Sequence, residues 1–83
     1  LMIGLIESYV KNWTENDVFN FARKENINLN KQELSFVYDF IKNNYEELLE
    51  KGKDFDINKY QNRFTQENFN KIKQLIIKYS ELL

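Results

Sequence analysis

The chain has 83 residues, with 13 acidic and 12 basic side chains that give a net charge of −1. This length suits a single domain over residues 1–83, because independent cores usually need roughly 50 to 200 residues. The balanced charge argues against a dedicated nucleic-acid surface, and the absence of cysteine excludes a disulfide scaffold and thiol chemistry. No apolar run approaches the roughly 20 residues that span a bilayer, so we expect a cytoplasmic protein with no membrane segment.

Hydrophobic periodicity predicts an all-α fold, a small bundle of helices. Four helices are expected at about residues 2–12, 15–25, 31–51 and 66–82, with a short helical turn near 56–63. The chain contains no proline. The ends of the helices must therefore be set by capping residues, by asparagines and by Gly52.

Capping signals repeat along the chain and predict where the helices begin. Thr14 is followed three residues later by Asp17, and Asn30 by Glu33, so each pair can form a capping box. Thr65 stands in the same position before the last helix. We also expect Asn26 to take the left-handed conformation that ends the second helix.

The helix at 31–51 is expected to lie at the centre of the bundle, because it is apolar on two sides. One stripe should face the core, and it comprises Leu34, Val37, Tyr38, Ile41, Tyr45, Leu48 and Leu49. Phe36 and Phe40 project together onto the opposite side. Either the 53–64 segment or an end of the first helix covers them, or they form an interface for a partner or a second copy. We favour a non-enzymatic interaction module of unknown role, with a homodimer plausible.

Residues suited to chemistry are scarce. Histidine is absent, as is any glycine-rich phosphate loop, so we expect no enzyme and no cofactor. Asp54, Asp56 and Asn58 match the opening of a calcium-binding EF-hand loop. Lys59 replaces its turn-forming glycine and Thr65 its bidentate glutamate, so we expect no metal site.

The alternative function is a helix-turn-helix domain that binds nucleic acid through the helices at 15–25 and 31–51. Its contact residues would be Arg23, Lys24, Lys31, Gln32 and Ser35. Glu33 and Asp39 would then face the DNA, and the chain carries no positive net charge. Nucleic acid is therefore an unlikely partner on this evidence.

The run from Trp13 to Glu33 reads WTENDVFNFARKENINLNKQE. It resembles the YqfT-like family of short proteins from Bacillus and its relatives, in which a capped stretch leads into a long helix and a C-terminal amphipathic helix. The resemblance covers most of the chain and implies a small, helical, cytoplasmic bacterial protein. The family has no assigned activity, so it offers no functional residues to carry over.

Overall fold

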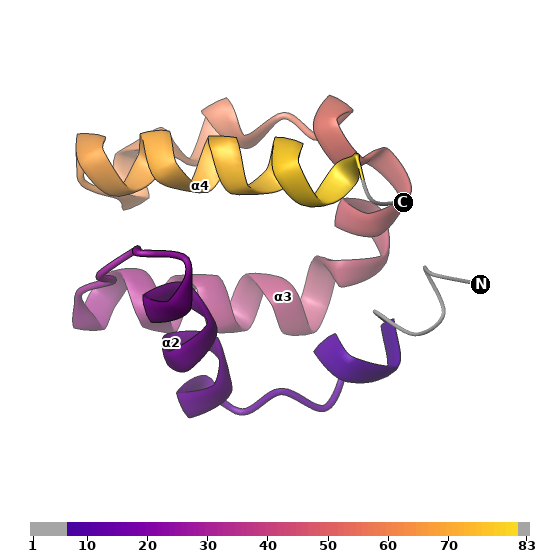
Figure 1. Cartoon of the computed structure of the whole chain (residues 1–83), viewed down its shortest axis with the longest axis horizontal. Coiled ribbons are helices and arrows are strands. Elements are labelled where there is room, and N and C mark those ends of the chain that lie inside the picture. The colour runs from indigo at the N-terminus through magenta and orange to yellow at the C-terminus, as the bar shows by residue number, and fades with distance from the viewer. Residues whose placement is uncertain (1–6, 82–83) are drawn as a thin grey trace.

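The computed structural model describes residues 7–81, which form helices and no strand (Figure 1), and the expected all-α fold is confirmed. Its labelled elements are α2 (Glu15–Lys24), α3 (Lys31–Lys51), the 3-10 helices η1 (Gly52–Asp54) and η2 (Ile57–Arg63), and α4 (Gln66–Ser80). The helices expected at 15–25 and 31–51 are found within a residue. Residues 7–10 are also helical. The remainder of the helix expected at 2–12, from 2 to 6, and the end of the one expected at 66–82 lie outside the described residues.

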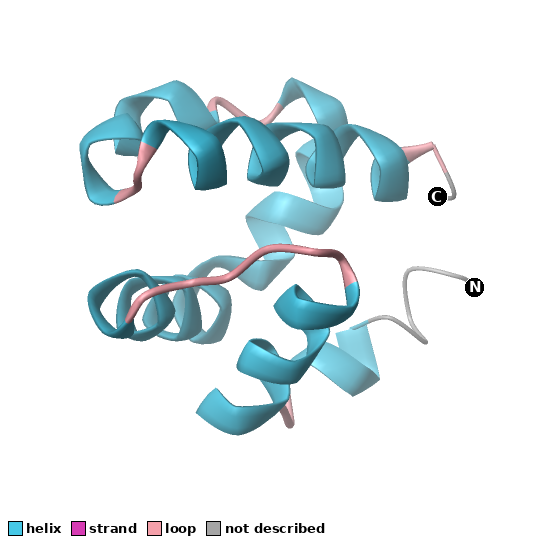
Figure 2. Cartoon of the chain, turned by 60° about the vertical axis from the view of Figure 1, so that its left-hand side comes forward, coloured by secondary structure: helices cyan, strands magenta, loops and turns pink. Residues whose placement is uncertain are grey.

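The helices form two layers, best separated in Figure 2. One layer contains α2 and α3, with α2 crossing in front of α3 in Figure 1, and the other contains η2 and α4. The 3-10 helix η1 connects the layers at the end of α3. The long helix α3 contacts α2, η1 and η2, while α4 packs on η1 and η2. The central position expected for the helix at 31–51 agrees with these contacts.

The expected capping boxes are present. The hydroxyl of Thr14 accepts from the amide of Asp17 at 3.1 Å, and the amide of Thr14 donates to the Asp17 carboxylate at 2.9 Å. Asn30 and Glu33 make the same two bonds, both at 2.8 Å. Thr65 caps α4. These bonds satisfy amide groups that the first turn of a helix leaves free, which explains why the predicted starts are correct.

Two residues with positive φ end the helices, as expected. Asn26 has φ 66° two residues after the end of α2, and Gly52 has φ 54° directly after α3. A Cβ added at Gly52 would lie 3.1 Å from Cβ of Ser80. Glycine is therefore required at this position both for the backbone conformation and for the close approach of the end of α4.

The segment from 52 to 64 contains more helix than the single turn expected near 56–63. It forms η1 and η2 in succession, and Asp56 caps η2 by accepting from the amide of Asn58 at 3.1 Å. Between them the side chain of Phe55 is buried. The extra 3-10 helix follows from the abrupt end of α3, because the amide of Phe55 bonds back to the Gly52 carbonyl.

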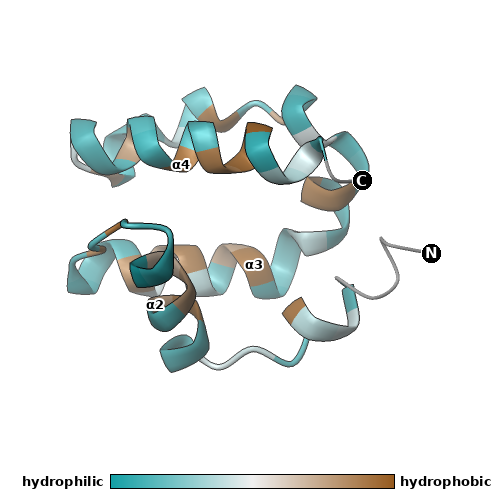
Figure 3. Ribbon diagram, viewed as in Figure 1, coloured by the Kyte–Doolittle hydropathy of each residue, from teal (hydrophilic) through white to brown (hydrophobic). Residues whose placement is uncertain are grey.

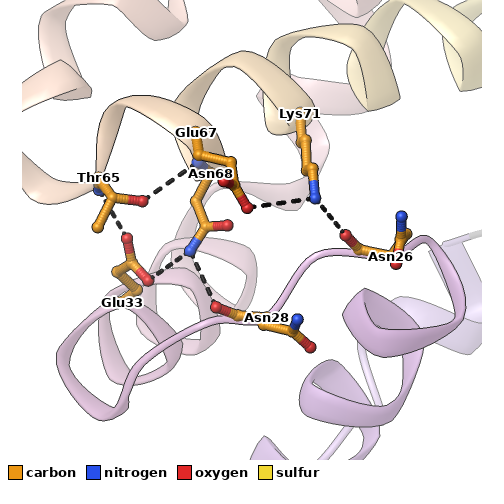
Figure 4. Close-up of polar contacts among 7 residues, drawn as sticks. All are labelled: Asn26, Asn28, Glu33, Thr65, Glu67, Asn68 and Lys71. Atoms are coloured by element: carbon orange, nitrogen blue, oxygen red, sulfur yellow. Dashed lines mark hydrogen bonds and ion pairs between the residues drawn. The ribbon is translucent and has the colours of Figure 1, made fainter.

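A buried carboxylate joins the starts of α3 and α4 (Figure 4). Glu33 is 1 % exposed, and its Oε1 accepts from the amide of Asn30 and from Nδ2 of Asn68, each at 2.8 Å. Its Oε2 accepts from the amide of Thr65 at 2.8 Å. Asn68 also donates to the carbonyl of Asn28 at 3.0 Å. One capping residue of α3 therefore also caps the neighbouring layer, and this network fixes how the two layers meet.

Polar contacts also tie α4 to the end of α2. Lys71 donates to the carbonyl of Asn26 at 2.9 Å (Figure 4). Further along α4, the Glu25 carboxylate accepts from Nζ of Lys78 at 3.0 Å and from the hydroxyl of Tyr79 at 2.9 Å. These bonds lower the pKa of Glu25, and they raise the pKa of Lys78. One edge of the two-layer structure is thus held by hydrogen bonds.

Candidate functional site

An apolar groove lies between the layers. It has a volume of about 420 Å³ and is bounded by α2, α3 and α4. Figure 3 shows hydrophobic stretches along α3 and α4, the two helices that supply most of its walls. The wall residues include Phe21 and Ala22 of α2, Val37, Ile41, Tyr45 and Leu48 of α3, and Ile72, Leu75, Ile76 and Tyr79 of α4. Tyr9, Val10 and Trp13 line it from the N-terminal side.

Among the described residues, burial is greatest at one end of this groove and least at the other. Ala22, Ile27 and Leu29 form a buried cluster at the connection between α2 and α3. The α3 wall is half-buried from Val37 to Leu48, and Tyr9, opposite its second half, is 74 % exposed. The most exposed part of the described lining therefore lies where the 7–13 segment approaches the second half of α3, and we call this place the mouth of the groove.

The rim carries a chain of aromatic contacts that crosses from the N-terminal segment to α4. The ring centroids of Trp13 and Phe21 are 5.2 Å apart, and those of Phe21 and Tyr79 are 5.7 Å apart. Aromatic pairs at such distances are attractive beyond the area that they bury. Because Trp13 is the chain's one tryptophan, its fluorescence reports directly on this rim.

The chemistry of the groove is almost entirely apolar. Among the described residues none of its lining side chains is charged, and the polar ones are tyrosines, Trp13 and Ser80. The hydrogen bond to Glu25 and partial burial raise the pKa of Tyr79. Partial desolvation, followed by the nearby carboxylates of Glu46 and Glu7, raises the pKa of Tyr45. Both hydroxyls are thus held neutral, and the groove offers apolar contact rather than proton transfer.

An empty space of this size is costly for so small a protein. At about 24 cal/mol per Å³, an enclosed void of about 420 Å³ costs about 10 kcal/mol. A domain of 83 residues has a total stability of roughly 4 to 12 kcal/mol at ordinary values per residue. Among the described residues the groove is not enclosed, so the full cost does not apply, and its apolar walls favour any apolar occupant.

Phe36 and Phe40 lie in an aromatic cluster. Tyr60 of η2 contacts both rings, at centroid distances of 5.5 and 5.2 Å, while Phe64 packs on Phe36 at 5.7 Å and Phe55 on Phe40 at 5.4 Å. The 55–64 segment therefore covers much of this face, which is the first of the two expected explanations. Both rings stay half-buried and both also line the apolar groove, so their role in an interface stays a prediction.

The residues of the nucleic-acid alternative are all exposed, and they comprise Arg23, Lys24, Lys31, Gln32 and Ser35. The guanidinium of Arg23 lies 5.8 Å from the centroid of the Phe19 ring. Asp39 is exposed as expected, whereas Glu33 is buried beneath the start of α4. The expectation that Glu33 would face DNA is wrong, because its carboxylate is used up by three hydrogen bonds.

The remaining site classes have little support in the described part of the chain. Residues 7–81 contain no group of three or more acidic residues that could hold a metal ion. No helix in this range is both long and apolar enough to cross a bilayer. Comparison with models of known protein families, with curated proteins and with solved structures finds no match to the chain. The resemblance to YqfT-like proteins therefore stays a prediction.

Sequence reasoning identified the residues of the groove but not the groove itself. Val37, Ile41, Tyr45 and Leu48 were expected to fill a core. Val37 does pack against the buried cluster of Ala22, Ile27 and Leu29, and all four half-buried side chains also line the groove. Periodicity reveals which side of a helix is apolar, but not how far away the facing helix lies. The signal that bears on the question is the high share of aromatic residues, 16 % of the chain, which is more than a small core hides.

Proposed function

We propose that this protein is a non-enzymatic interaction module that binds an apolar segment of a partner protein in the groove. The observation that carries the proposal is the lining of the groove, which has no charged side chain among the described residues and a volume of about 420 Å³. Pockets of roughly 300 to 1,000 Å³ with a mainly apolar lining are the size of typical small-molecule sites, and a groove of this kind can also take the apolar side chains of a peptide. The absence of cysteine is compatible with the reducing cytoplasm as its location.

The shape of the groove favours a helical segment as the occupant. Its walls are three helices, and an amphipathic helix laid in a helical groove inserts side chains at i, i+3 or i+4 and i+7. Each fully buried leucine contributes about 1.5 to 3 kcal/mol. Three or four such side chains contribute about 5 to 12 kcal/mol, and association costs at least about 4 kcal/mol, so we expect a millimolar affinity that approaches micromolar at best.

A neutral peptide tests this proposal directly. The probe is a helical peptide of about 15 residues with leucines at i, i+3 and i+7 and glutamines elsewhere. Trp13 fluorescence and calorimetry should both report binding with a Kd between about 1 μM and 1 mM. If neither the peptide nor a neutral hydrophobic dye such as Nile red enters the groove, the proposal fails.

A matched pair of substitutions locates the binding site. Leu48 lines the mouth of the groove, whereas Ile77 lies on the outside of α4 and is 46 % exposed. Leu48→Lys should lower the affinity for the peptide at least about tenfold. A buried apolar contact is lost, and the lysine ammonium group must remain hydrated. Ile77→Lys should leave the affinity within about twofold. If the two variants change the affinity equally, the peptide does not bind in the groove.

Self-association is the second protein-binding arrangement, with a further copy of this chain as the partner. It would use the α3 wall, where Phe36 and Phe40 also contribute. Light scattering over a range of protein concentrations tests it. If the protein is monomeric at every concentration and still binds the peptide, the partner is a different protein. A dimer that the peptide dissociates makes a second copy the occupant.

Nucleic-acid binding is the alternative function, and it has one specific observation in its favour. Arg23, Lys24, Lys31, Gln32 and Ser35 are all exposed, and burial of Glu33 removes one acid from their surroundings. The net charge of −1 works against it. A gel shift at low salt with duplex DNA tests the alternative, which is abandoned if no duplex is retained.

A further inference from the structure

The mouth of the apolar groove adjoins an acidic surface. A shallower hollow of about 250 Å³ shares Gly52 and Ser80 with the groove, and carboxylates of Glu50, Asp54 and Glu81 line it. All three acids are exposed. Their charges therefore stand in solvent beside the open end of the apolar surface.

Two further carboxylates lie at this end, next to Tyr45. Tyr45 lines the groove, and Glu46 and Glu7 are close enough to it for their charges to raise the pKa of its hydroxyl, after the larger effect of desolvation. Glu46 is exposed and Glu7 is half-buried. We call these five residues the acidic end: Glu7, Glu46, Glu50, Asp54 and Glu81.

The charge of the acidic end is not balanced within the described residues. Lys51 and Lys53 line the same hollow, and Lys11 and Lys42, which share a hydrogen bond, each stand one helical turn from Glu7 or Glu46, so five acids face four bases. Between residues 7 and 81 the ion pairs are Lys71 with Glu67 and Lys78 with Glu25, and neither includes a member of the acidic end. The mouth of the groove thus has one more acid than base among these residues, and the C-terminal ends of α3 and α4 add partial negative charge beside it.

We infer that the partner helix carries lysine or arginine residues beside its apolar face, on the flank that meets the acidic end. This inference rests on the proposed function and specifies the chemistry of its partner. The apolar side chains occupy the groove, and the basic ones reach the carboxylates at its rim. Rim charges of this kind set association rate and choice of partner more than affinity.

Other occupants fit this charge distribution less well. An anionic amphiphile such as a fatty acid would place its carboxylate at the acidic end, where like charges repel. A second copy related by a two-fold axis that runs along the groove would bring its own acidic end against this one. A basic amphipathic helix satisfies both the apolar walls and the acidic rim.

Three peptides that share one leucine face test the inference. One carries lysines on the flank, one glutamines and one glutamates, and each is titrated into the full chain with Trp13 fluorescence as the readout. The lysine peptide should bind about tenfold more tightly than the glutamine peptide at low salt, and the glutamate peptide more weakly than both. About 0.5 M salt should remove most of the difference, because it shortens the Debye length to about 4 Å.

Substitutions in the protein provide the second arm. The triple variant Glu46→Gln/Glu50→Gln/Glu81→Gln should lower the affinity for the lysine peptide roughly tenfold. Its affinity for the glutamine peptide should stay within about twofold of that of the unmodified chain. The control is Glu15→Gln/Asp39→Asn, which removes two exposed acids that line neither the groove nor the hollow. It should change neither affinity by more than about twofold.

The outcomes separate the two proposals. If no peptide binds, the proposed function fails and the inference with it. If the three peptides bind equally, or the control variant acts as strongly as the triple variant, the groove function stands and the basic partner is refuted. If the lysine peptide binds most tightly, and only the triple variant loses this preference, both the groove function and the basic partner are supported.

Discussion

Replacing Glu33 by glutamine should destabilise the protein strongly, although the two side chains have almost the same shape. The carboxylate of Glu33 is 1 % exposed and accepts three hydrogen bonds at 2.8 Å. In Glu33→Gln one oxygen becomes an NH2 group. Even in the better orientation, with the oxygen kept towards Asn30 and Asn68, that NH2 faces the amide of Thr65, donor against donor.

The expected loss follows from this geometry. A hydrogen bond to a charged group contributes about 1.5 to 3 kcal/mol, and a buried donor without an acceptor costs about 1 to 3 kcal/mol. We expect Glu33→Gln to lower the free energy of unfolding by about 3 kcal/mol. For a domain of this size that corresponds to a fall in Tm of about 12 to 24 °C.

Urea unfolding followed by circular dichroism measures this loss. The matched control is Glu15→Gln, since Glu15 is an exposed glutamate in the first turn of α2, and it should change stability by less than about 0.5 kcal/mol. A free energy of unfolding for Glu33→Gln within about 0.5 kcal/mol of the unmodified chain would show that the network in Figure 4 does not hold the layers together.

The other predictions concern the contacts around the end of α4. Hydrogen bonds from Lys78 and Tyr79 lower the pKa of Glu25, so its stabilising effect is complete above the ordinary value of about 4.3 and is lost as pH falls through the lowered value. Glu25→Gln should therefore cost about 1 kcal/mol at pH 7 and close to nothing in acid, and a cost independent of pH in thermal unfolding would contradict this. Gly52→Ala should cost about 1 to 2 kcal/mol in urea unfolding, because φ is 54° and the new Cβ would lie 3.1 Å from Ser80. Unchanged stability there would mean that the backbone turn differs from the one described.

The local features of this fold could be predicted because their signals lie within four residues. Thr14 with Asp17 and Asn30 with Glu33 are spaced for capping boxes, and both boxes form. Gly52 ends α3 because a positive φ there carries little cost for glycine. In each case the residues that decide the structure are neighbours in sequence, so no knowledge of the tertiary arrangement is needed.

The arrangement of the layers could not be predicted, because it depends on contacts between distant residues. Glu33 and Asn68 are 35 positions apart, and nothing in the sequence near either residue indicates that they meet. The same limit hides the groove, whose width depends on where these contacts place α4 relative to α3. Phe36 and Phe40 illustrate it as well, since only the course of the 55–64 segment decides how far they are covered.

The position of Glu33 has a consequence for the direction of the helices. The first turns of α3 and α4 lie side by side at the carboxylate, and the last turn of α4 lies against Gly52 at the end of α3, so the two helices run parallel (Figure 1). Parallel neighbours bring the positive ends of their macrodipoles together, which is unfavourable. The buried negative charge of Glu33 lies between the two N-termini and offsets the positive ends of both macrodipoles. The orientation of an entire layer is therefore stabilised by one counter-charge, placed where two helix dipoles converge.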